Sequence, residues 1–100
     1  MHDWTLISVL FEWAIGRVTL SFENHAGSET LVARSVVDLR VPQFNEWGPS
    51  VSVNKVKGPF AVDDGLHSIE IQMQSGDIIK IVASSFEMPR EQAHAHSRPG

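Results

Sequence analysis

The stretch HSIEIQMQSGDIIKIVA, from His67 to Ala83, decides the fold class of this sequence. Isoleucine recurs at every second position on both sides of the segment Gln74-Ser75-Gly76, which is the period of a β-strand with one buried face. A three-residue loop that ends in glycine is a favoured hairpin connection, because glycine readily adopts the left-handed conformation required there. The stretch therefore predicts an antiparallel hairpin with this register: Ile69 opposite Ile81, Glu70 opposite Lys80, and Ile71 opposite Ile79.

The N-terminal part of the chain alternates in the same way on both sides of a short turn over residues 14–17. Apolar residues occupy every second position of 7–13 and 18–22, although Leu10 interrupts the polar face of the first run. We expect a second hairpin whose inner face pairs apolar residues throughout: Trp13 with Val18, Phe11 with Leu20, and Val9 with Phe22. This register assigns Trp13 to the core.

The middle of the chain predicts further strands. Residues 29–35 and 36–42 form two of them, and Val51 and Val53 keep strand alternation within 50–54. A crossover or a short helical turn is expected between Gln43 and Leu66. The fold class is therefore all-β with at most one short helix: an antiparallel meander of six to seven strands that forms a small barrel or sandwich. Residues 1–88 form one β-domain, and residues 89–100 are expected to be a disordered tail.

The composition excludes several functions. The chain has 100 residues, of which 42% are hydrophobic, so one domain can form a core without a metal or a disulfide. There is no cysteine, which removes disulfides and thiolate chemistry. The N-terminus lacks the regions of a signal peptide, and no apolar segment approaches the ~18 residues of a membrane helix. We therefore expect a cytoplasmic protein that does not act at a membrane.

Charge and motifs predict neither nucleic-acid binding nor catalysis. The net charge is −4, and Lys55 with Lys57 is the closest approach to a basic cluster. His94 and His96 lie in the expected tail, where a metal ion would have no supporting residues around it. No phosphate-binding loop, dinucleotide fingerprint or nucleophile motif is present. We expect no enzyme, no cofactor and no metal site.

The stretch from Phe44 to Phe60 contains the candidate binding residues. Trp47 sits between Asn45-Glu46 and Gly48-Pro49, outside any predicted strand. Its expected role is to pack over an open end of the sheet, and the alternative is an exposed anchor for a partner, since tryptophan dominates interface energetics. The residues left without a structural duty are the candidate site: Trp47, Ser50, Ser52 and Asn54.

The order of several motifs resembles a group of small, uncharacterised bacterial proteins. These motifs are His2-Asp3 with Leu6, Glu12-Trp13 at the end of the first strand, the segment WGPSVSVNKV from Trp47 to Val56, and the segment from Ile69 to Ile81. More distantly, the chain is similar to the immunity protein 50 class of bacterial polymorphic toxin systems. That similarity implies a toxin as a protein partner, and it implies no catalytic residue.

Three functions remain open from the sequence. The first is a non-enzymatic protein-binding module that contacts a partner through the loop around Trp47, with toxin immunity as one form of it. The second is a small-ligand-binding β-barrel whose cavity is lined by Trp4, Trp13 and Trp47. The third is a homodimer in which Val51 and Val53 form an edge strand that pairs across a two-fold axis.

Overall fold

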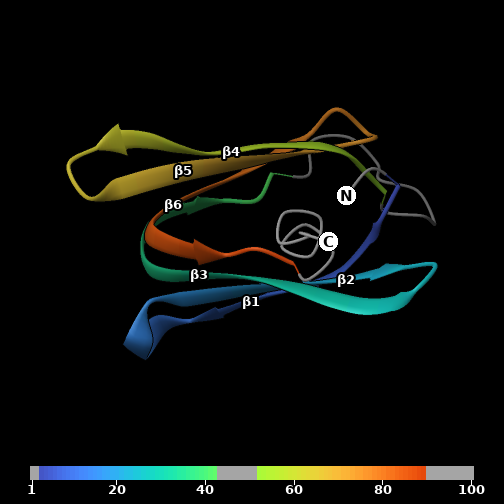
Figure 1. The fold of residues 1–100 in the computed structure, drawn as a ribbon, viewed down its shortest axis with the longest axis horizontal. Helices are drawn as coiled ribbons and strands as arrows, with labels where there is room; N and C mark the ends of the chain where they lie inside the picture. The colour runs from blue at the N-terminus through green and yellow to red at the C-terminus, as the bar shows by residue number, and fades with distance from the viewer. Residues whose placement is uncertain (1–2, 43–51, 90–100) are drawn as a thin grey trace, which may run out of the picture.

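The computed structural model describes residues 3–42 and 52–89 of the chain and forms one antiparallel sheet (Figure 1). The predicted all-β class with six strands is confirmed. One 3₁₀ turn, η1, lies between the first two strands. The elements in chain order are β1 (Thr5–Glu12), η1 (Trp13–Ile15), β2 (Arg17–Asn24), β3 (Gly27–Arg40), β4 (Val53–Asp63), β5 (Leu66–Met73) and β6 (Ile78–Glu87).

The strand order β1-β2-β3-β6-β5-β4 consists of two three-stranded meanders joined by the pairing of β3 with β6. Strands β3 and β4 follow one another in the chain but lie three places apart in the sheet. The connection between them therefore crosses from the middle of the sheet to its far edge, which confirms the expected crossover. Its residues 43–51 lie outside the described ranges.

The single sheet folds over on itself, so that β1 and β2 lie on one side and β4 and β5 on the other (Figure 1). Strands β3 and β6 bend and run through both sides. The two edge strands meet at one end only, where Thr5 bridges Ser52 and the Val53 backbone bonds with Asp3 and Trp4 at 2.8 Å each. The sheet is thus curled and open, and it does not close into the barrel that was one of the two expected forms.

The bend in β3 has two local causes. Ser35 adopts a left-handed backbone with φ 56°, and the register with β6 shifts between Val36 and Asp38. A β-bulge of this kind bends a strand and increases its twist. The two strands expected over 29–35 and 36–42 are therefore wrong as separate elements, because the chain passes this kink without leaving the sheet.

The core lies between the two sides of the folded sheet. Its residues come from every strand and are fully or almost fully buried: Trp4, Leu6, Val18, Leu20, Phe22, Leu31, Ala33, Val53, Ile69, Ile71, Met73, Ile79, Ile81 and Ala83. The Trp4 ring packs against Phe22 with 5.9 Å between ring centroids. These side chains fill the interior with hydrophobic atoms, which is the main source of stability for a domain of this size.

The two predicted hairpins had different outcomes. In β5–β6 all three expected pairs are present, including Glu70 opposite Lys80. In β1–β2 the expected register is wrong by two residues, since Phe11 pairs with Val18 and Val9 with Leu20. The physical reason is that η1 takes Trp13 out of the strand and into the turn.

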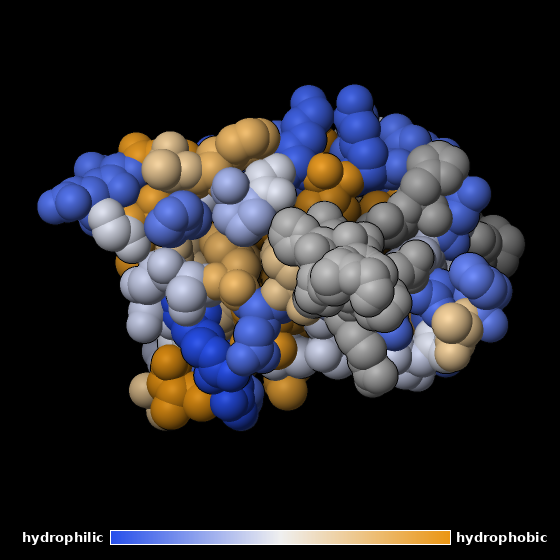
Figure 2. Space-filling model, in the orientation of Figure 1, coloured by the Kyte–Doolittle hydropathy of each residue, from blue (hydrophilic) through white to orange (hydrophobic). Residues whose placement is uncertain are grey.

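The structure describes only the first residue of the expected disordered tail. Pro89, with which the expected tail begins, is buried, and residues 90–100 with His94 and His96 lie outside the described ranges. Across 3–42 and 52–89, no helix has the length and apolar character needed to cross a bilayer. On the surface, hydrophobic residues show over the β1–β2 turn at the lower left and over the β4–β5 hairpin at the upper left (Figure 2).

Candidate functional site

The predicted site around Trp47 is only partly visible. Trp47 and Ser50 lie outside the described residues, as does Val51. The Ser52 carbonyl accepts a hydrogen bond from the Gln74 backbone N–H at 2.9 Å, so Ser52 ties the start of β4 to the β5–β6 loop. Asn54 is the extra residue of a bulge, because Val53 pairs with Met73 and Lys55 with the next residue, Gln72. Both residues thus have structural roles in β4.

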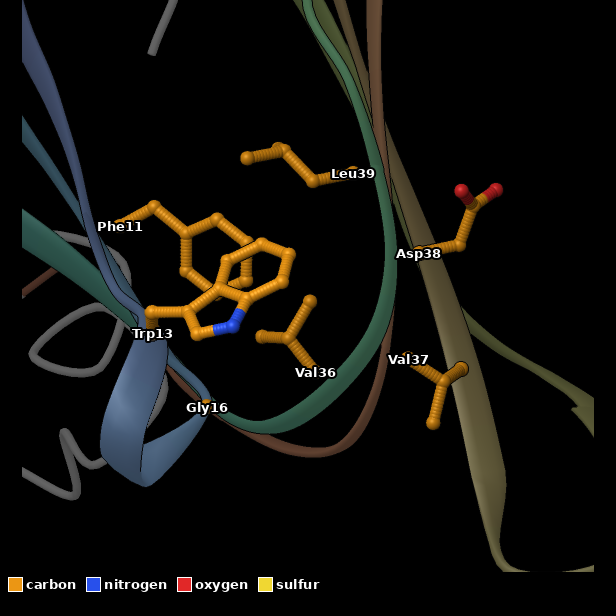
Figure 3. Close-up of a pocket in the computed structure, with 7 residues that line it drawn as sticks. All are labelled: Phe11, Trp13, Gly16, Val36, Val37, Asp38 and Leu39. Atoms are coloured by element: carbon orange, nitrogen blue, oxygen red, sulfur yellow. The ribbon is translucent and has the colours of Figure 1, made fainter.

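A pocket of about 550 Å³ lies elsewhere, between the β1–β2 turn and the bend of β3 (Figure 3). Two aromatic and several aliphatic side chains make most of its lining, which consists of Phe11, Trp13, Gly16, Val36, Val37, Asp38 and Leu39. The volume falls within the range of roughly 300–1,000 Å³ that small-ligand pockets occupy. We take this pocket as the candidate functional site.

Trp13 is the most exposed large hydrophobic residue of the part that the structure describes, with 82% of its surface accessible. Its ring lies against Phe11, with 5.0 Å between ring centroids and an angle of 56° between the planes. Figure 3 shows both rings directed toward Val36 and Leu39 across the pocket. The expectation that Trp13 belongs to the core is therefore wrong: the indole touches Phe11 in a tilted arrangement and most of its surface meets solvent.

The turn that presents Trp13 is held at both ends. Gly16 has φ 63°, which closes the turn, and its N–H donates to the Trp13 carbonyl at 3.3 Å. The Gly16 carbonyl accepts from the Val36 N–H at 2.9 Å, which fastens the turn to the kinked part of β3. Because the same two elements line the pocket, this bond fixes the distance between its walls.

An ion pair closes the base of the same turn. The Arg17 Nε donates to the Glu12 Oε1 at 2.7 Å, and the two residues are also cross-strand partners. The hydrogen bond from Arg17, together with its positive charge, lowers the pKa of Glu12 below its ordinary value of 4.5. For the same reason the pKa of Arg17 is raised. The two side chains thus neutralise each other's charge at the base of the turn that carries Trp13.

The opposite wall comes from the bend of β3. Val37 is the extra residue of the bulge and is 63% exposed. Asp38 forms an ion pair with Arg40 at 3.3 Å. In Figure 3 the side chains of Val37 and Asp38 point away from the two rings, so the space in front of the rings is lined by Val36 and Leu39. The pocket is thus apolar inside with a charged pair at its rim.

The arrangement can bind an apolar group and offers little for catalysis. Among the pocket residues only Asp38 has a titratable side chain, and it is paired with Arg40. No group of three or more metal-ligating side chains occurs within 3–42 and 52–89. Sequence reasoning overlooked this site. A signal for it exists in Glu12 and Arg17, whose opposite charges flank the segment Trp13-Ala14-Ile15-Gly16 and identify it as the turn.

Comparison with known proteins supports the fold. No protein-family model matches this chain, and no curated protein matches it. The chain is similar to the crystal structure of an uncharacterized protein from Neisseria gonorrhoeae, with a TM-score of 0.58 and 18% sequence identity. The match covers 87% of this chain and 90% of the other. At this identity the likeness shows a shared fold alone, which extends over nearly the whole length of both chains.

Proposed function

We propose that this chain is a non-enzymatic protein-binding module and that the Trp13 pocket receives an apolar side chain of the partner. The observation that carries the proposal is an 82% exposed tryptophan on a turn whose backbone is fastened to β3. A single exposed apolar side chain is ordinary, but an exposed apolar side chain beside an apolar pocket forms a contiguous apolar surface, which is a mark of interaction sites. Tryptophan anchors beside preformed pockets contribute much of the energy of many interfaces.

Rigidity of the turn favours binding as well. The Gly16–Val36 bond and the Glu12–Arg17 ion pair hold the backbone of the turn in place before a partner arrives. A turn that is already ordered loses little conformational entropy on association, so more of the contact energy appears as affinity. Two further exposed apolar residues belong to the elements that form the pocket: Ile15 in the turn and Val37 at the bulge of β3.

Toxin immunity, which the resemblance implies, is one form of this proposal. An immunity protein must bind its toxin tightly, and a preformed apolar pocket with a tryptophan anchor suits such a contact. The pocket itself favours no particular protein class, so the identity of the partner as a toxin stays a prediction.

Small-ligand binding is the second candidate, and the pocket volume of about 550 Å³ favours it. Its form differs from a barrel cavity between tryptophans, since Trp4 is buried in the core and does not line the pocket. A ligand would stack on Trp13 and change its fluorescence. Titration with apolar compounds that leave Trp13 emission unchanged at millimolar concentration would argue against this candidate.

The test of protein binding compares two exposed aromatic residues. Immobilised protein captures candidates from the native host, and each purified candidate is then titrated by calorimetry. We expect Trp13→Ala to weaken binding about tenfold or more, with a change in unfolding free energy within about 1 kcal/mol. Phe60→Ala is the matched control, because Phe60 is exposed on β4 away from the pocket residues. Unchanged affinity of Trp13→Ala would remove the pocket from the binding surface.

A further inference from the structure

The open sheet has two edge strands, and they are protected to different degrees. Edge strands present unpaired backbone N–H and C=O groups that can pair with another strand, and proteins protect them with lysine, proline and bulges. The edge strands are β1, which pairs with β2, and β4, which pairs with β5. They differ in how many of these protective features they contain.

Strand β4 carries all of these protective features. Its register with β5 shifts at three places, and its longest regular run is Lys55 to Lys57. Pro59 supplies no N–H, and Gly58 has φ 106° with no room for a Cβ, which would lie 2.6 Å from the Ser68 carbonyl oxygen. At its start, both backbone groups of Val53 already bond with Asp3 and Trp4, the two residues before β1. The backbone of Val53, one of the two residues of the possible dimer edge in the sequence analysis, is therefore already bonded within the chain.

Strand β1 lacks most of this protection. Ser8 to Glu12 pair with β2 in one unbroken register, and the one shift in the strand lies before Ser8. The strand contains neither lysine nor proline, and Glu12 is its one charged residue. Leu10 is 56% exposed on the face opposite the core, and Ile7 is 54% exposed. Among the described residues, the edge of β1 has a neighbour only at its beginning, through the bridge from Thr5 to Ser52.

We propose that β1 pairs antiparallel with β1 of a second copy of this chain, across a two-fold axis at Leu10. The two six-stranded sheets would then continue through the interface. This register uses only the regular run from Ser8 to Glu12, so the bridge between β1 and β4 stays intact. It also keeps side chains on matching faces, with Val9 opposite Phe11 on the inner face and Leu10 opposite Leu10 on the outer face.

Charge and pattern favour a second copy as the occupant of this edge. In the two-fold register Glu12 of one chain lies opposite Ser8 of the other, so no like charges face each other across the strands. Val9 and Phe11, which are half-buried at the margin of the core, gain apolar neighbours. The pattern of β1 is thus complementary to itself. The regular run from Ser8 to Glu12 has only five residues, so we expect a weak dimer.

The test measures the mass of the full chain in solution by sedimentation equilibrium. We expect the average mass to rise toward that of two chains as the concentration increases from about 10 μM to 1 mM. Leu10→Lys should weaken dimerisation about tenfold or more, because the two lysines face each other at the axis. Val62→Lys is the control: Val62 is 53% exposed on β4, close to the exposure of Leu10, and this variant should dimerise like the parent.

A charge swap tests the register itself. Leu10→Glu should also weaken self-association, while an equimolar mixture of the Leu10→Lys and Leu10→Glu variants should dimerise again through a lysine–glutamate contact. A parent chain that stays monomeric at 1 mM overturns the inference and leaves the edge to a strand of another protein. Dimers that resist Leu10→Lys, or a mixture that stays monomeric, overturn it as well. Phe11 takes part in this register and also lines the Trp13 pocket, so pairing through β1 would reach one wall of that pocket.

Discussion

The hairpins β1–β2 and β5–β6 belong to the two different halves of the sheet, and their turns are built differently. In β5–β6 the loop closes tightly: the Met73 N–H donates to the Asp77 carbonyl, and the Gly76 N–H donates to the Met73 carbonyl, both at 2.9 Å. In β1–β2 a 3₁₀ turn forms the connection and is fastened to a third strand at Val36. One hairpin is closed by its own loop, whereas the other depends on a distant part of the chain.

The construction of the turns explains why the sequence specifies the register of β5–β6 but leaves that of β1–β2 open. Shifting a strand pair by two residues keeps every side chain on its own face, so apolar alternation cannot distinguish such registers. The turn must therefore determine which register forms. The three residues before Asp77 leave one choice in β5–β6, whereas in β1–β2 a four-residue turn over 14–17 and one over 13–16 satisfy the same alternation. The turn over 13–16 is the one present, and it leaves Trp13 in the solvent.

The largest expected effect on stability comes from replacing, one at a time, two leucines of the first hairpin by alanine. Their side chains lie on opposite faces of the sheet. Leu20→Ala removes a fully buried side chain and should cost about 2–5 kcal/mol of unfolding free energy. Leu10→Ala acts on an exposed side chain and should stay within about 0.5 kcal/mol. Urea denaturation measures both. If the two variants lost equal stability, Leu10 and Leu20 would both lie in the core and the faces assigned to β1 and β2 would be wrong.

The parts of the fold that follow from local pattern were predictable, and those that rest on distant contacts were not. Alternation around Ile69 and Ile81 needs only neighbouring residues, and the expected pairs are present. The kink at Ser35 is different, because serine rarely adopts φ 56° and nothing nearby in the sequence indicates it. The bond from Val36 to Gly16 joins residues far apart in the chain. The pocket depends on both features.

The candidate site was missed for the same reason. Trp47 attracts attention because it stands outside any predicted strand, whereas Trp13 ends a run of alternating apolar residues and was assigned to the core. Whether a tryptophan at a strand end is buried or exposed depends on whether the turn begins after it or includes it. Trp13 lies in a turn and is exposed, so it has the features of a binding anchor that the sequence suggests for Trp47.

An intermediate effect is expected from the glycines that close the two turns. Gly76 has φ 99° and Gly16 has φ 63°, and a Cβ at either position meets no atom closer than 3.6 Å. Alanine therefore acts through backbone strain, which is about 1 kcal/mol near the left-handed minimum and larger away from it. We expect Gly76→Ala to lower the melting temperature more than Gly16→Ala. The reverse order would indicate that the bond from Gly16 to Val36 is disturbed and contributes more than the strain.

The smallest effect concerns the ion pair that closes the first turn. Because Arg17 lowers the pKa of Glu12 in the folded chain, the carboxylate stabilises the fold at pH values above its ordinary pKa of 4.5. This contribution is lost as the pH falls through the lowered folded-state pKa. The melting temperature of Glu12→Gln should therefore lie below that of the parent at pH 7 and approach it in acid. Combining Glu12→Gln with Arg17→Gln provides the control, since the non-additivity of the two substitutions should be present at pH 7 and absent in acid. A difference that persists unchanged down to pH 2 would show that Glu12 acts through the packing of its methylene groups against the turn rather than through its charge.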